Sequence, residues 1–451
     1  MEKLLIYGIF IIALFGGLIK AIGIPDYYTI ATEIFIVYLF LISPLTDRNR
    51  HGYSFHLWYV FLFMLFISIC SMAINQSGFL PIIYSFRLLF RFYLFYLAII
   101  TISYDDDSIK KLNKLLITLL LLELPVVAYK FHLYGINERT MGAYVLDDGS
   151  LATILPITVI FYLLGFYFLY QPKRWYLLAA FGFVLLSIAG KKRAVFFLYP
   201  LQALVIYYYI YVKGKGVSFS KKLGTFILLC VLIGGISGSI LSFNDTLNPE
   251  GKIGGSVNAE YAIRFAQKYT MAENGYGYST GRLSTTIRIF ENLWSLGFTN
   301  ICLGIGPGSL TASVLDIKGQ MRRVVQTKNE LGFAYGTTAM SKIAVEYGVL
   351  GIIVYSLMIF SFARMSWRYY SHEVDPYWKA FAAGSVGFAF AMLFFFFAYG
   401  DTAIWGGTIP PLYFYAMAIV YTRSQRISDH VSSIDLSHKR FDTKSFHENY
   451  N

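Results

Sequence analysis

Long apolar runs, separated by short polar breaks, follow one another along most of this 451-residue chain. A helix that rises about 1.5 Å per residue needs roughly 20 apolar residues to cross about 30 Å of hydrocarbon, and most of the runs approach this length. The pattern therefore predicts an all-α fold, a polytopic transmembrane bundle of about twelve helices. The predicted spans are residues 4–24, 27–44, 56–74, 81–103, 115–134, 151–170, 175–190, 194–212, 223–243, 337–363, 380–399 and 408–422.

One polar segment, residues 244–336, is much longer than the other breaks. A connection of that length is usually functional. Aromatic residues recur at roughly four-residue spacing within 256–271, and 285–296 could form a second helix, so the segment is predicted to contain short amphipathic helices. We expect these helices to lie on the membrane surface, joined by a glycine-rich turn at 273–281.

Lysine and arginine residues are distributed unevenly between the two sides of the predicted spans. An N-terminus in the cytoplasm puts most basic short connections on the cytoplasmic side, as the positive-inside rule requires. Residues 244–336 then form a large extracytoplasmic loop. The predicted organisation is spans one to nine in 1–243, the loop in 244–336, spans ten to twelve in 337–422 and a polar cytoplasmic tail in 423–451.

Composition supports the membrane interpretation and removes other classes. The chain is 56% hydrophobic and only 14% charged, whereas soluble domains are about a quarter charged. The formal net charge is +12, but the positive residues mostly occupy short connections, so no nucleic-acid partner is predicted. The cysteines and histidines show no ligand spacing, and we expect neither a metal nor a cofactor.

Three consecutive cations, Lys191, Lys192 and Arg193, oppose the positive-inside rule, because the predicted topology places them at the outer mouth of a tight hairpin. A Lys or Arg at the centre of a membrane helix costs about 2.5–3.5 kcal/mol, although less near the interface. The cluster therefore predicts contact with an anion. The alternative interpretation is an interfacial patch that touches lipid phosphates.

Further candidate cations lie in the long loop and inside one span. Guanidinium groups bind phosphate oxygens in pairs, although surface arginines can also serve solubility alone. Two more arginines lie one helical turn apart in the span 81–103, where they would mark a substrate path or form an ion pair with Glu123. These candidates are Arg264, Arg282, Arg288, Arg322 and Arg323 in the loop, and Arg87 and Arg91 in the span.

Arg282 and Arg288 are six residues apart. On a continuous helix this spacing places the two side chains on different faces. A ligand shared by both would therefore require a bend between them, or a helix that begins near Thr285.

Four features together resemble the bacterial O-antigen ligase and polysaccharide polymerase superfamily. A basic cluster ending in Arg193 opens an apolar span, and Arg288, with Arg282 as a neighbouring candidate, precedes a turn of glycines. The motif Glu346-Tyr-Gly-Val-Leu-Gly351 opens the tenth predicted span. The fourth feature is the architecture, with one large loop before that span. The glycines of the turn are Gly304, Gly306 and Gly308.

The resemblance implies a metal-independent glycosyltransferase in the bacterial cytoplasmic membrane. Its donor would be an oligosaccharide linked to undecaprenyl pyrophosphate, and its acceptor a glycan hydroxyl at the outer face. Arg193, Arg282 and Arg288 would stabilise the departing pyrophosphate. Membrane lipids, a chain-length regulator and a flippase are the implied partners. The remaining implied substrate-binding residues are Lys191, Lys192, Arg87, Arg91, Arg264, Arg322, Arg323, Gly304, Gly306 and Gly308.

Ligases of the family carry a His-Asn pair before the Glu-x-Gly motif, where this chain has Thr337-Thr338. A neutral imidazole is a natural proton acceptor near pH 7, so its absence favours a polymerase over a ligase that uses a lipid A core acceptor. The proton acceptor is then left open among loop carboxylates. A lipid-linked oligosaccharide flippase is the alternative from another class, because such transporters also have many spans and internal arginines. The candidate carboxylates are Glu273, Glu291 and Asp316.

Overall fold

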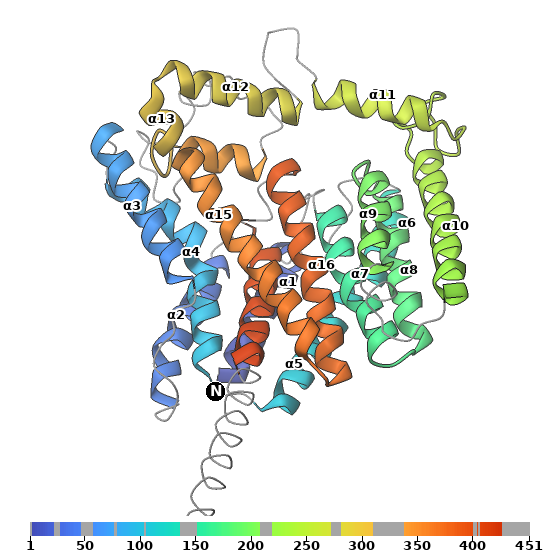
Figure 1. Ribbon diagram of the computed structural model, residues 1–451, viewed down its shortest axis with the longest axis horizontal. Helices are drawn as coiled ribbons and strands as arrows, with labels where there is room; N and C mark the ends of the chain where they lie inside the picture. Colours follow the sequence, from blue (N-terminus) through green and yellow to red (C-terminus); the bar gives the residue numbers. More distant parts are fainter. Residues whose placement is uncertain are drawn as a thin grey trace, which may run out of the picture.

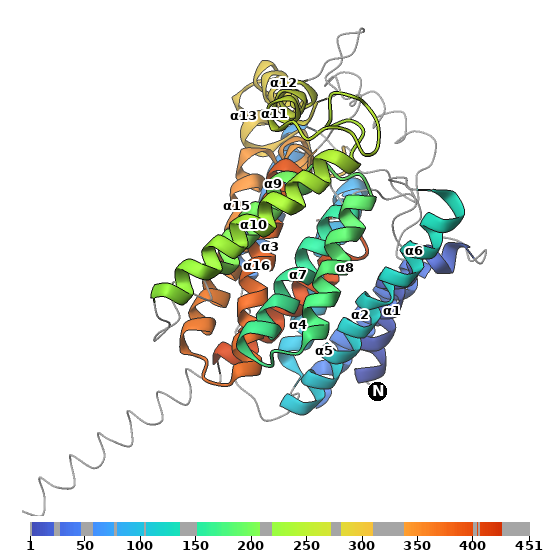
Figure 2. The same ribbon diagram turned by 90° about the vertical axis from the view of Figure 1, so that its right-hand side faces the viewer.

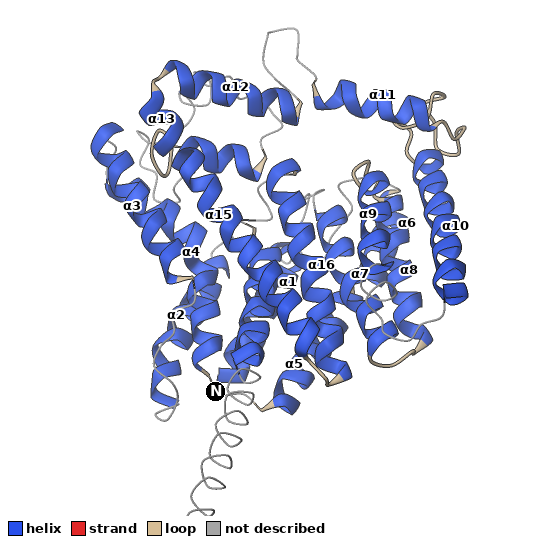
Figure 3. Ribbon diagram, viewed as in Figure 1, coloured by secondary structure: helices blue, strands red, loops and turns tan. Residues whose placement is uncertain are grey.

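The computed structural model describes residues 2–21, 28–46, 57–75, 79–102, 105–135, 151–207, 219–271, 281–309, 338–399, 404 and 406–425. Every regular element in these ranges is a helix and none is a strand (Figure 3), so the predicted all-α class is confirmed. The first ten helices are α1 (Glu2–Ala21), α2 (Tyr28–Thr46), α3 (Trp58–Asn75), α4 (Phe79–Thr101), α5 (Asp106–Leu121), α6 (Glu123–Tyr134), α7 (Leu151–Leu169), α8 (Arg174–Ala189), α9 (Val195–Tyr207) and α10 (Phe219–Phe243). They are followed by α11 (Ala259–Thr270), α12 (Arg282–Ser295), α13 (Phe298–Leu303), α15 (Ala339–His372), α16 (Pro376–Ala398) and a last helix over 409–425.

Within the described ranges, six helical stretches are long and apolar enough to cross a membrane. Their length and composition support a membrane protein, while the expected total of about twelve crossings stays a prediction. Shorter apolar helices occur at Ile30–Ser43, Arg174–Ala189, Val195–Val205 and Cys230–Phe243. The six long stretches are Trp58–Asn75, Pro81–Thr101, Asp106–Leu133, Ala152–Leu169, Ala339–His372 and Pro376–Ala398.

The apolar helices pack into a bundle with two distinct ends (Figures 1 and 2). α16 packs between α15 and α7, and α1, α2 and α4 form a neighbouring group. At one end α11, α12 and α13 run across the bundle, and we call them the roof helices. The N-terminus and the end of helix 409–425 lie at the opposite end, the base, where Lys3 contacts Ser108 and Arg423 contacts Asp106.

The roof helices α11 and α12 form where the amphipathic pattern predicts helices. Asn258 caps α11, since its side-chain oxygen accepts a hydrogen bond from the Tyr261 N–H at 2.9 Å. Ala262 of α11 and Ile289 and Leu293 of α12 are buried, whereas the polar faces are turned outward. Tertiary burial of one apolar face thus holds these short helices in place.

α15 is broken at Gly348, whose φ of 66° lies in the left-handed region. Its first segment runs below α12, roughly parallel to the roof, before the chain turns down into the bundle (Figure 1). A Cβ atom at Gly348 would lie 2.2 Å from the Cys302 carbonyl oxygen, and one at Gly304 would lie 2.6 Å from that of Val345. Only glycine permits this approach. The glycine turn after α13 therefore packs directly on the break in α15.

Candidate functional site

A cavity of about 400 Å³ lies under the roof helices at the roof end of the bundle. Its walls come from segments distant in sequence: the turn between α8 and α9, α11, the start of α12, the start of α15 and the end of α16. The lining is both cationic and aromatic. The cavity is lined by Lys191, Lys192, Arg193, Ala194, Phe197, Phe265, Ala266, Thr270, Arg282, Leu283, Thr286, Thr338, Met340, Phe394, Phe397, Ala398 and Tyr399.

The α8–α9 turn presents three of the cations. α8 ends at Ala189, and the next residues close a tight turn in which the Lys191 N–H donates to the Ile188 carbonyl at 3.0 Å. Lys191 itself has a φ of 53°, which is uncommon for a residue with a side chain. Lys192 is only 6% exposed, and the Arg193 guanidinium lies 5.3 Å from the centre of the Phe265 ring. The turn thus holds its positive charges at the cavity wall.

Arg282, the first residue of α12, supplies the fourth cation from the other side of the cavity. Its Nη1 donates to the carbonyl oxygen of Ala398 at 2.8 Å, and its guanidinium carbon lies 4.1 Å from the centre of the Tyr399 ring. The carbonyl is at the C-terminal end of α16, where the helix dipole is negative. Within the described ranges Arg282 has no carboxylate partner, so no acid there neutralises its charge.

The start of α15 faces the same cavity. Thr338 caps this helix, since its hydroxyl accepts from the Ser341 N–H at 3.0 Å, and the Ala339 N–H donates to the Tyr399 carbonyl at 3.0 Å. α12 also begins at the cavity with Arg282. Helix N-termini carry partial positive charge and add to the attraction that the four cations exert on an anion. Thr338 therefore lies at the site.

Aromatic side chains complete the wall and make the cavity amphipathic. Phe197 and Phe397 are exposed, and Phe394 lies beside them in the lining. Rings of this kind can contact a hydrocarbon tail or stack against a sugar face. The lining thus suits a ligand with an anionic head and an apolar or glycan part.

Arg288 lies apart from the four cations that line the cavity. α12 begins at Arg282, before Thr285, and continues as one helix, so Arg282 and Arg288 project from different faces. Arg288 is absent from the cavity lining. The condition for a shared ligand, a bend or a later helix start, is therefore not met.

Other predicted loop residues also lie apart from the cavity. Arg264 is exposed on α11 and pairs with Glu260 on the same helix. Glu291 is exposed on α12 and does not line the cavity. Four predicted site residues, together with Thr337, lie outside the described residues: Glu273, Asp316, Arg322 and Arg323.

The glycine turn has a structural explanation that differs from substrate binding. The carbonyl oxygen of Gly304 accepts from the Ser71 hydroxyl and the Asn75 amide, both at 3.2 Å. A Cβ atom at Gly308 would lie 2.7 Å from Pro81. Gly304, Gly306 and Gly308 are not among the cavity-lining residues, and the turn joins α3, α4 and α15 instead.

Arg87 and Arg91 both pair with Glu33 of α2. An ion pair was one of the two predicted alternatives for these arginines, but Glu33 was not the predicted partner. Arg87 Nε lies 2.6 Å from Glu33 Oε2 of α2, and Arg91 Nη1 lies 3.4 Å from Glu33 Oε1. Glu123, the partner proposed from the sequence, is not the acid in these pairs. A lone carboxylate inside a predicted span was the available signal for Glu33.

Sequence reasoning also missed Asp245, whose Oδ2 lies 2.8 Å from Lys191 Nζ. It is the second residue after α10 and belongs to no recognised motif. The aromatic residues that line the cavity could not be singled out from the sequence either, because Phe and Tyr are abundant throughout the chain.

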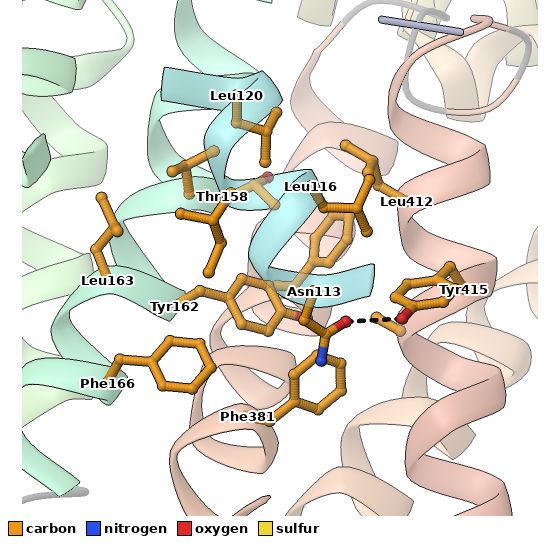
Figure 4. A pocket seen from close by; sticks show the side chains of 14 residues that line it. Asn113, Leu116, Leu120, Thr158, Tyr162, Leu163, Phe166, Phe381, Leu412 and Tyr415 are labelled. Atoms are coloured by element: carbon orange, nitrogen blue, oxygen red, sulfur yellow. Dashed lines mark hydrogen bonds between the residues drawn. The ribbon is translucent and has the colours of Figure 1, made fainter. Parts of the chain in front are cut away.

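A second, smaller cavity of about 70 Å³ lies in the middle of the bundle between α5, α7, α16 and helix 409–425 (Figure 4). Its walls are nearly all apolar. The Asn113 amide donates to the Tyr377 hydroxyl at 3.1 Å and accepts from that of Tyr415 at 2.7 Å. The polar atoms at this cavity are thus engaged within the protein, and it offers no charge to an anion.

Over the part of the chain that the structure describes, no group of three or more His, Cys, Asp or Glu side chains could hold a metal ion. No protein-family model matches the sequence, and a search of curated proteins gives no significant match.

Proposed function

We propose that the protein is a polysaccharide polymerase that transfers an undecaprenyl-pyrophosphate-linked glycan to a hydroxyl of an acceptor glycan. The observation that carries the proposal is the convergence of Lys191, Lys192, Arg193 and Arg282 on one amphipathic cavity. These cations come from two segments far apart in the chain, and three of them belong to a cluster that the topology rule disfavours at that position. A lipid-linked pyrophosphate has the charge and the hydrocarbon tail that such a lining complements.

The proposed reaction is a substitution at the anomeric carbon of the donor sugar. The acceptor hydroxyl oxygen forms the new bond to that carbon, while the bond from carbon to the phosphate oxygen breaks and its electron pair stays on the pyrophosphate. The hydroxyl proton leaves to a carboxylate or to water. Arg193 and Arg282 stabilise the charge that develops on the leaving group, which is where preorganised cations accelerate a reaction.

The proposal also includes a topology that the helices alone leave open. About twelve crossings with both termini in the cytoplasm would place the roof helices and the cavity on the outer face of the membrane. In support, the described N-terminus and the end of helix 409–425 both lie at the base, opposite the roof. An outer-face site has access to lipid-linked glycans and needs no nucleotide.

The test is elongation by the purified protein, reconstituted with lipid-linked repeat units in the absence of nucleotide sugars. We expect longer lipid-linked chains from the wild type and none from Arg193→Gln or Arg282→Gln. Arg174→Gln is the matched control, because Arg174 is exposed at the other end of α8. Arg288→Gln should keep activity, since Arg288 does not line the cavity.

Other products would identify other functions. Transport of the lipid-linked sugar across the bilayer without new glycosidic bonds would favour the flippase, and transfer to a lipid A core acceptor would favour the ligase. Elongation of wild-type length in both cavity variants would reject the proposed site.

A further inference from the structure

We infer that Asp245 is an internal counter-ion of the cavity, which competes with a phosphate ligand for Lys191 and thereby limits how tightly a diphosphate is held. The inference rests on the proposed function, because it concerns the same anion site. It assigns a role to a carboxylate that neither the motifs nor the proposed reaction uses.

The contact between the two side chains is short and lies at the rim of the cavity. Lys191 Nζ is 2.8 Å from Asp245 Oδ2, and the side chains are 20% and 35% exposed. Lys191 lines the cavity, whereas Asp245 is not among the lining residues and accepts a hydrogen bond from Lys191. An ion pair with this exposure is weak, so a ligand with more negative charge can replace the carboxylate.

Asp245 is held in position by the residue before it. The Asn244 side chain donates to the Lys191 carbonyl oxygen at 2.7 Å, and Asn244 is only 2% exposed. The Asn244 side-chain oxygen in turn accepts from the Thr246 hydroxyl at 2.7 Å. The turn after α10 therefore contacts Lys191 at two points: Asn244 binds its carbonyl oxygen and Asp245 binds its ammonium group. This double contact also accounts for the persistence of the unusual backbone conformation of Lys191.

The charges around the cavity determine the direction of the effect. Four cations line the cavity, and Asp245 forms an ion pair with one of them, Lys191. A phosphate that approaches Lys191 must displace Asp245 and then experiences repulsion from it at close range. Coulomb's law at an effective dielectric of about 40 and a charge separation of about 6 Å gives roughly a tenfold loss of affinity for one pair of unit charges. A ligand that contacts several cations at once offsets the repulsion from Asp245 most completely. The Lys191–Asp245 pair should therefore favour diphosphates over single phosphates.

The test measures binding of inorganic pyrophosphate to the full-length protein in detergent by titration calorimetry. We expect Asp245→Asn to bind about tenfold more tightly than the wild type and Asp245→Glu to bind as the wild type does. Asp245→Ser gives a second neutral variant should the asparagine form fold poorly. In a Lys191→Gln background, the gain from Asp245→Asn should fall to about threefold or less, because the competition for the ammonium group is lost.

Glu250→Gln is the matched control in the same turn. Glu250 pairs with Lys252 at 2.6 Å and is not a cavity-lining residue. The hydrogen bond from Lys252 lowers the pKa of Glu250 below the ordinary value, which keeps this carboxyl charged near neutral pH. Its removal changes the net charge equally but should leave pyrophosphate binding unchanged.

The outcomes separate this inference from the proposed function. If the wild type binds pyrophosphate and the neutral Asp245 variants bind equally or more weakly, the counter-ion role is wrong while the proposed site stands. If neither the wild type nor these variants bind pyrophosphate, both proposals fail. An equal gain from Glu250→Gln would show a general charge effect and would also reject the specific role of Asp245.

Discussion

The two ends of the bundle use the same side chain in opposite ways. At the base, Arg423 lies 4.6 Å from the centre of the Trp378 ring and bonds to Asp106 at 2.7 Å and Glu373 at 3.3 Å. At the roof, Arg282 stacks on an aromatic ring in a similar way, but its polar partner is a neutral backbone carbonyl. The aromatic contact is common to both ends, so the difference lies in the acids.

This difference distinguishes a structural charge from one that is available to a ligand. The base arginine joins the starts of α5 and α16 to the end of α15, and its charge is neutralised by two carboxylates. The roof arginine keeps its charge beside a cavity that three further cations line. Removing the first should therefore cost stability, and removing the second should cost binding.

The largest effect is expected from Arg423→Gln. The substitution leaves Asp106 and the buried Glu373 without their counter-ion, which should destabilise the protein by about 3–5 kcal/mol. Thermal unfolding in detergent measures the loss, and pyrophosphate affinity of the folded fraction should not change. Arg423→Lys should recover part of the stability. A stable Arg423→Gln protein would contradict the structural assignment of the base.

Gly304→Ala should have the next largest effect on stability. The φ of 72° at Gly304 disfavours alanine, and the new Cβ would lie 2.6 Å from backbone atoms of α15. Gly297→Ala is the matched control, because Gly297 has a φ of 111° and no atom within 4 Å of the added Cβ. We expect Gly304→Ala to cost about 2 kcal/mol more than Gly297→Ala. Equal unfolding free energies would show that the close packing contributes nothing.

Arg282→Gln should have the opposite effect to Arg423→Gln, with a large loss of pyrophosphate affinity and a small loss of stability. Loss of one charge-assisted contact to phosphate should weaken pyrophosphate binding by about 2 kcal/mol, roughly 30-fold, while stability falls by only about 1 kcal/mol from the lost bond to Ala398. Calorimetric titration and thermal unfolding of the same sample separate the two quantities. Arg174→Gln should alter neither. A large stability loss without a binding loss would make Arg282 a structural residue like Arg423.

The smallest effect is expected from Asn113→Leu in the apolar cavity (Figure 4). The change removes the partner of the Tyr377 and Tyr415 hydroxyls and should cost about 1–2 kcal/mol of unfolding free energy. Pyrophosphate binding should be unaffected, because this cavity contains no charged residue. A change in pyrophosphate affinity would connect the two cavities and weaken the division of roles between them.

The sequence predicted helices well wherever one physical signal dominates. Apolar runs of span length became helices, and the spacing of Tyr261 and Phe265 correctly indicated α11. The cluster at Lys191–Arg193 stood out because its charges oppose the topology rule. Its convergence with Arg282 required tertiary structure, since the two segments meet only through the packing of α11 and α16 around the cavity.

Several contacts were not predictable from the sequence, because a motif does not identify the residues that it will contact. Arg87 and Arg91 were visible as intramembrane charges, but Glu33 lies more than fifty residues earlier and belongs to another helix. Gly304 looked like part of a ligand turn, yet the carbonyl groups that it approaches belong to its own chain. Arg282 and Arg288 lie six residues apart on one helix, and this spacing by itself places the two side chains on different faces.

The break in α15 also limits which parts of the molecule can move. The Val345 carbonyl loses its regular helical environment at the break, and the Ile305 N–H of the α13 turn donates to it at 2.8 Å. Lifting α13 from α15 would leave that carbonyl unpaired, so α12, α13 and α15 should behave as one rigid body. Spin labels on α13 and α15 should then keep a single separation whether or not pyrophosphate is bound, and a ligand-dependent separation would refute this coupling. α11 lines the cavity through Phe265, Ala266 and Thr270, so its displacement would open the site without breaking this coupling.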